Sequence, residues 1–302
     1  MSRIDCRQHR AFTLIELLVV MGILVLLAVL TGITVGQVSQ NARLSSGVNQ
    51  VTASLGTARA LAIKKNRPVM LLFLLAVDPD RPEDGERVVM QLAESTGNIH
   101  TRYDDIQWYD EQYVPIIGIP AVELPKGVKV AGPINSGYQL PDCSGLGDGD
   151  EFWVTQPGGE WKLAGDNPYT EEIGRQIGVI FSPTGQVITR NIKGAGASGS
   201  VIWPFFDRNF DRRANVDVNP LGLGGVLKFV AFNTIDNEPD VFPVQWLAVY
   251  DDDLLRETKG AAGFEGEDGD CERIAVISEW VDQYGVPVLF NRYTGIAEVY
   301  EP

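Results

Sequence analysis

Residues 10–41 read RAFTLIELLVVMGILVLLAVLTGITVGQVSQN, and Glu16 is the only charged residue that follows Arg10 in this stretch. From Leu17 to Asn41 no residue is charged, and most are Leu, Val, Ile, Ala or Gly. About 20 apolar residues are enough for a helix to cross a bilayer. The sequence therefore predicts a helix that spans a membrane and continues beyond it.

The segment before this run is basic, with Arg3, Arg7 and Arg10 against the single acid Asp5. The positive-inside rule keeps such a segment in the cytoplasm and sends the rest of the chain outward. A cleavable secretory signal would have an apolar region of about 7–15 residues and then a small-x-small site. The longer run here favours an anchor that stays in the protein.

Glu16 is a carboxylate near one end of a predicted membrane helix, where a charge needs a partner. Cleavage after Ala11 would create one, because the α-amine of Phe12 is a cation at neutral pH. Between two parallel helices shifted along their axes, the amine of one helix can meet Glu16 of the other. The pair would then favour assembly and set the axial step.

The sequence Ala11-Phe12-Thr13-Leu14-Ile15-Glu16-Leu17 resembles the prepilin processing and methylation motif of type IV pilins and type II secretion pseudopilins. That family has a short basic leader, Phe after the cut and Glu at the fifth mature position; Ala11 stands where Gly is usual. The resemblance implies cleavage by a prepilin peptidase between Ala11 and Phe12. It also implies N-methylation of Phe12 and contact between Phe12 and Glu16 of neighbouring subunits.

Beyond the membrane run, apolar residues recur at spacings of three and four, as in an amphipathic helix that packs one face on a partner. This stripe consists of Leu44, Val48, Val51, Leu55, Ala58 and Ala62. Pro68 forces the residue before it out of helical conformation, so the helix is expected to end near Asn66.

After Pro68 the sequence becomes rich in short β-type runs separated by Gly, Pro, Asp and Asn. The expected strands are Val69–Val77, Arg87–Ala93, Val114–Ile119, Gly127–Ala131, Gly178–Phe181, Gln186–Ile192, Val201–Phe206, Val226–Phe232, Val244–Val249, Arg273–Ile277, Val286–Phe290 and Ala297–Tyr300. The predicted fold class is α+β, a long N-terminal transmembrane and amphipathic helix packed on a β-rich head. The predicted regions are a leader (1–11), a transmembrane helix (12–38), its amphipathic continuation (39–66) and the head (67–302).

Three short head segments are similar to the pseudopilin H and FimT group. They are the helix end Arg59–Val69, the strand and turn Val179–Gly185, and the closing hairpin segment Asn291–Gly295. The head is long for that group, and 78–86, 141–151 and 259–270 are predicted to be inserted loops.

Cys6 would leave with the leader, so a Cys143–Cys271 disulfide or two separate thiols would remain in an oxidising compartment. Asp207, Asn209 and Asp211 have the spacing that opens a calcium loop, but Arg212 stands where that loop needs glycine. We therefore expect solvated acidic loops and no cofactor, with calcium the weaker alternative.

The formal net charge is −15, which argues against nucleic acid as a partner. Gly194–Gly199 matches G-x-G-x-x-G, but the following residues predict a strand and not the helix that a dinucleotide site requires. His100 is the only histidine after the leader, and no hydrolase or metalloprotease motif occurs. The sequence predicts no enzyme.

The chain is thus expected to be a pseudopilin or minor pilin of a type II secretion or type IV pilus system. Its implied partners are other pilin or pseudopilin subunits, the prepilin peptidase and the inner-membrane assembly platform. It would cross the inner membrane once, with a cytoplasmic N-terminus and a periplasmic head, before it enters a filament. Two alternatives stay open: a DNA-uptake or adhesive minor pilin whose head binds a ligand, and an anchored binding protein that never polymerises.

Overall fold

The computed structural model describes residues 14–77, 86–103, 106–134, 152–155, 176–188, 201–207, 228–229, 241–264, 270–291 and 293–300. The chain divides into two compact units, Met1–Arg43 and Leu44–Pro302. The helices are α1 (Leu14–Lys65), α2 (Asp252–Phe264) and α3 (Asp270–Tyr284). The strands are β1 (Val69–Val77), β2 (Glu86–Tyr103), β3 (Ile106–Pro115), β4 (Val122–Glu123), β5 (Val128–Ile134), β6 (Phe152–Thr155), β7 (Gln176–Phe181), β8 (Val201–Phe206), β9 (Lys228–Phe229), β10 (Val241–Pro243), β11 (Trp246–Asp251), β12 (Val286–Phe290) and β13 (Ala297–Val299).

Helix α1 ends at Lys65, close to the end that Pro68 predicts, and Asn66 terminates the helix. This residue adopts a left-handed conformation with φ of 52°. Its amide donates to the Ile63 carbonyl at 3.3 Å, and the Arg67 amide donates to the Ala62 carbonyl at 3.3 Å. These two bonds form a Schellman cap. Its left-handed residue, here Asn66, is usually glycine and sometimes asparagine.

The predicted apolar stripe of α1 is buried in the second unit. Val51, Leu55, Ala58 and Ala62 are at most 1% exposed, so the helical spacing of the stripe is confirmed. They join a core that includes residues from β1, β2, β5, β7 and β11. At Gly47 the helix comes so close to β5 that an added Cβ would lie 2.7 Å from Val128 Cγ1. The absence of a side chain at Gly47 therefore permits this close approach.

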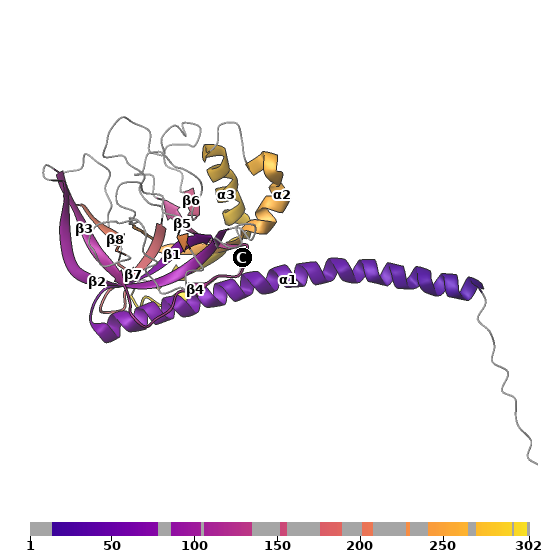
Figure 1. Cartoon of the computed structure of the whole chain (residues 1–302), viewed down its shortest axis with the longest axis horizontal. Coiled ribbons are helices and arrows are strands. Elements are labelled where there is room, and N and C mark those ends of the chain that lie inside the picture. Colours follow the sequence, from indigo (N-terminus) through magenta and orange to yellow (C-terminus); the bar gives the residue numbers. More distant parts are fainter. Residues whose placement is uncertain are drawn as a thin grey trace, which may run out of the picture. The chain divides into compact units, whose positions relative to one another are not determined.

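The larger sheet has the order β10-β7-β1-β2-β3-β8, with β4 beside β2 and β9 beside β1. Its end strands β10 and β8 contact each other, so the sheet curls on itself (Figure 1). All six strands contribute to the apolar core of buried residues Met70, Leu72, Leu74, Val89, Ala93, Tyr113, Ile180, Phe206 and Val241. Alternate residues of β1 face this core and the α1 core, which explains the continuous apolar run of β1.

The smaller sheet is antiparallel, with the order β13-β12-β11-β5-β6. One face, which includes Leu247 and Val249, joins the core beneath α1. On β11, Ala248 and Tyr250 alternate with these residues and pack with α2 and α3. The head is thus α+β, as the sequence predicts, with both sheets contributing to the core beneath α1.

The sequence prediction is wrong at the helices α2 and α3. Residues 273–277 were expected to form a strand and lie inside α3, and the expected loop 259–270 contains the end of α2 and the start of α3. A helix is indicated by the three- and four-residue spacing of Ile277, Trp280 and Val281, all of which are buried. The apolar run 274–277 has only four residues, which is too short to distinguish a strand from a turn of buried helix.

Several strand bounds also differ from the prediction. Strand β2 is much longer than expected and has a register shift near Gly97, whose φ is 78°. The sequence predicts a strand at Val114–Ile119, but strand β3 ends at Pro115. The residues from Ile116 to Ile119 form a turn instead. Strands β1, β8 and β12 have the predicted bounds.

Candidate functional site: the N-terminal segment of the helix

The first turn of α1 contains Glu16, for which the sequence predicts a role in assembly. Glu16 is exposed, as are its neighbours on every side of the helix. An anion in the first turn of a helix is favoured by the helix dipole. The predicted cleavage and methylation positions, Ala11 and Phe12, lie outside the described residues.

The apolar side chains around Glu16 are exposed on every side of the helix. Between Leu14 and Leu27, the large apolar residues are between 50% and 83% exposed. These residues are Leu14, Ile15, Leu17, Leu18, Val19, Val20, Met21, Ile23, Leu24, Val25, Leu26 and Leu27. A helix that is apolar all round is normally covered by lipid or by other protein.

Among the described residues, no helix combines the length and the hydropathy that crossing a membrane requires.

In the second unit, Arg59 of α1 connects the helix to two turns that are distant in sequence. Its Nε donates to the Gly185 carbonyl at 3.2 Å and to the Thr294 carbonyl at 2.7 Å. The turns touch each other, because a Cβ on Gly295 would collide with the Gly185 carbonyl oxygen. All three segments with the pseudopilin-like sequences, Arg59–Val69, Val179–Gly185 and Asn291–Gly295, therefore meet at one point. The sequence predicts each segment but not their contact.

Asp207, the first calcium candidate, is fully buried at the end of β8. Its carboxylate accepts a hydrogen bond from the side-chain amide of Gln112, and its backbone amide donates to the Tyr113 carbonyl at 2.8 Å. The other two candidates, Asn209 and Asp211, lie outside the described residues. Within the described ranges, no group of three His, Cys, Asp or Glu residues is placed to hold a metal.

The cysteine prediction is also left open by the structure. Cys143 and the side chain of Cys271 lie outside what is described, although the backbone of Cys271 belongs to α3. The Cys143–Cys271 pairing stays a prediction.

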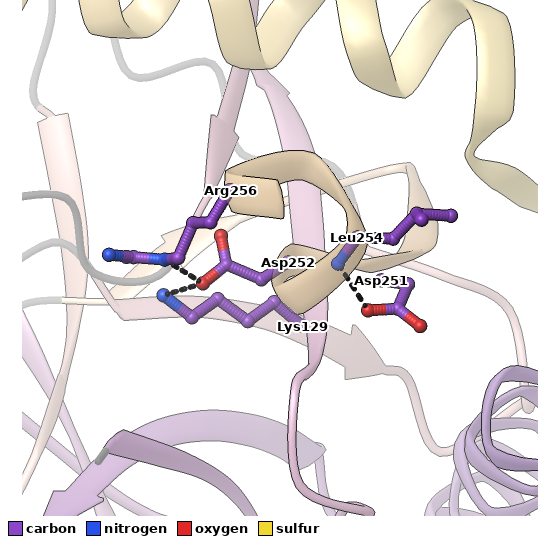
Figure 2. A network of polar contacts seen from close by, with 5 residues as sticks. All are labelled: Lys129, Asp251, Asp252, Leu254 and Arg256. Carbon is purple, nitrogen blue, oxygen red and sulfur yellow. Dashed lines mark hydrogen bonds and ion pairs between the residues drawn. The ribbon is translucent and has the colours of Figure 1, made fainter. Parts of the chain in front are cut away.

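A charge network around the buried side chains of Lys129 and Asp252, which the sequence did not predict, fixes the start of α2 (Figure 2). Asp252 Oδ2 accepts from Lys129 Nζ of β5 at 3.0 Å and from Arg256 Nε at 2.8 Å. The preceding residue, Asp251, caps the helix by accepting from the Leu254 amide at 2.9 Å. Breaking a buried ion pair leaves a charge without its partner, so this network fixes α2 on the smaller sheet. The three consecutive aspartates at 251–253 are the sequence feature that could have indicated this helix start.

The family model described as the prokaryotic N-terminal methylation motif matches residues 6–32. No curated protein and no solved structure matches the chain. The matched residues contain Ala11, Phe12 and Glu16 and the apolar run that follows. The chain therefore carries the processing and methylation signature of type IV pilins and pseudopilins. The match covers the N-terminal segment alone, and it supports a pilin-like substrate of a prepilin peptidase.

Proposed function

We propose that the chain is a non-enzymatic structural subunit of a type II secretion or type IV pilus filament. The observation that carries the proposal is the methylation motif at residues 6–32, followed by a helix segment with apolar side chains on every side. Within this class we place it nearest to the pseudopilin H and FimT group, because the three head segments similar to that group are in contact.

The proposed sequence of events begins with insertion in the inner membrane through the uncharged run from Leu17 to Asn41. Arg3, Arg7 and Arg10 support a cytoplasmic N-terminus and an outward head. Cleavage before Phe12 and methylation of its amine leave a cation that pairs with Glu16 of a neighbouring subunit. Methylation does not remove the positive charge, so the ion pair does not depend on it.

The test uses the full chain, expressed with a prepilin peptidase and its assembly machinery. Mass spectrometry of the membrane-bound protein should find N-methyl-Phe12 as the first residue. An intact Met1 terminus in the assembled protein would contradict the proposal.

Glu16→Ala should be processed like the wild type but should lose filament incorporation by about 10- to 150-fold. This range corresponds to the loss of one charged hydrogen bond, about 1.5–3 kcal/mol. Quantitative immunoblotting of sheared filaments measures it, with Glu16→Asp as the variant that keeps the charge. Normal incorporation of Glu16→Ala would refute the ion-pair mechanism.

A further inference from the structure

Charge is distributed very unevenly in the second unit. The nine residues 59–67 contain four basic residues and no acid, in a chain whose formal net charge is −15. Residues 251–284, by contrast, contain eleven acidic and three basic residues. The first segment is the C-terminal end of α1 and the residues of its cap, and the second forms α2, α3 and their connection.

At the end of α1, Lys64 and Arg67 are the exposed basic residues, and we call them the basic end. Two neighbouring cations are already engaged. Lys65 pairs with Glu94 at 2.8 Å, and Arg59 binds the two turn carbonyls. The basic end thus presents two positive charges beside a neutralised ion pair.

The acidic surface consists of the exposed residues Asp253, Glu257, Glu279 and Asp282 of α2 and α3, and we call it the acidic helix pair. The basic residues of these helices offset part of their acidic charge, including that of Glu279 in the acidic helix pair. Arg256 binds Asp252, and Lys259 lies 3.4 Å from Glu279. The buried Lys129–Asp252 contact fixes α2 on β5, so the acidic surface has a defined position in the head (Figure 2).

The two surfaces lie at different heights along α1. Gly127 adjoins Asp253 at the start of α2, and the next residue, Val128, packs on Gly47 of α1. The basic end lies at Lys64, further along the same helix by roughly 25 Å at about 1.5 Å per residue. Figure 1 shows α2 and α3 on the side of the head away from the C-terminal end of α1.

We propose that the basic end of one copy docks on the acidic helix pair of a second copy of this chain. The proposal rests on the proposed function, since parallel subunits shifted along a common axis carry all heads in the same direction. Opposite-signed surfaces at different heights then face each other in copies that are shifted by a matching distance along this axis. Such a head-to-tail contact uses two different surfaces and can repeat without closing, as a filament requires. Complementary charge of this kind fixes partner orientation and raises the association rate.

Charge reversal with rescue tests the contact in the full chain. Lys64→Glu with Arg67→Glu should reduce cross-linking between two differently tagged copies by about tenfold, and Glu257→Lys with Glu279→Lys should do the same. A copy with the first pair of substitutions should recover cross-linking when it is co-expressed with a copy carrying the second pair. Glu298→Lys, an exposed reversal on β13, is the control and should have no effect.

A zero-length carbodiimide cross-linker identifies the contact directly. The basic end and the start of α2 are separated by roughly 25 Å along α1 within one copy, so a Lys64–Glu257 or Lys64–Glu279 cross-link between the two tags would support docking. Normal assembly of both reversal variants would overturn the docking proposal alone, as would Lys64 cross-links that join only another subunit type. A wild-type chain that is not cleaved and never enters a filament would overturn docking together with the proposed function.

Discussion

The first and last thirds of helix α1 have the same backbone conformation but opposite surroundings. From Leu14 to Leu27 the large apolar side chains are at least half exposed, whereas Val51, Leu55, Ala58 and Ala62 are at most 1% exposed. The first third is apolar on every side, and the last third is apolar only on the face that packs in the head. The last third thus buries its apolar side chains in the fold, whereas those of the first third stay exposed in the described structure.

Substitution of leucine by alanine gives the largest expected contrast between the two thirds. Leu55→Ala should destabilise the head by about 2–5 kcal/mol, because it leaves a cavity in the core beneath α1. Leu24→Ala, the matched control at 58% exposure, should change head stability by no more than about 0.5 kcal/mol. Urea unfolding of the full chain in detergent, followed by tryptophan fluorescence, measures both. Equal losses would break the distinction between the two thirds.

A methyl group added at glycine gives a smaller contrast within the same helix. Gly47→Ala should cost about 1–3 kcal/mol, because its Cβ would overlap Val128. Gly56→Ala should instead stabilise the head by about 0.5–1 kcal/mol, because the site is open and alanine favours helix. The same unfolding experiment compares them, and a stabilising Gly47→Ala would show that α1 does not pack this closely on β5.

The smallest expected effect is at the helix end. Asn66→Ala should destabilise the head by about 1 kcal/mol, since alanine tolerates the left-handed conformation poorly. Asn66→Gly should be neutral within about 0.5 kcal/mol, because glycine adopts this conformation without steric cost. Thermal denaturation of the two variants distinguishes them. An equal effect of alanine and glycine would mean that the cap does not limit stability.

Prediction from sequence succeeded where the signal was local and periodic. The stripe from Val48 to Ala62, the stop at Pro68 and the bounds of β1 each follow from patterns within a few residues. It failed at α3, where the apolar residues 274–277 are compatible with a strand and with a helix equally well. Tertiary packing decides there, because Trp280 and Val281 must lie on Ala248 and Tyr250 of the smaller sheet.

The sequence by itself determined the motif around Phe12 and Glu16, the long helix and the β-rich head, since these depend on spacing, charge and hydropathy along the chain. Only the tertiary structure decided the contact of Arg59 with two distant turns and the burial of Asp252 between Lys129 and Arg256. It also decided the separation of the basic end from the acidic helix pair. These features join residues that are far apart along the chain, and their geometry depends on how the two sheets and α1 pack around a common core.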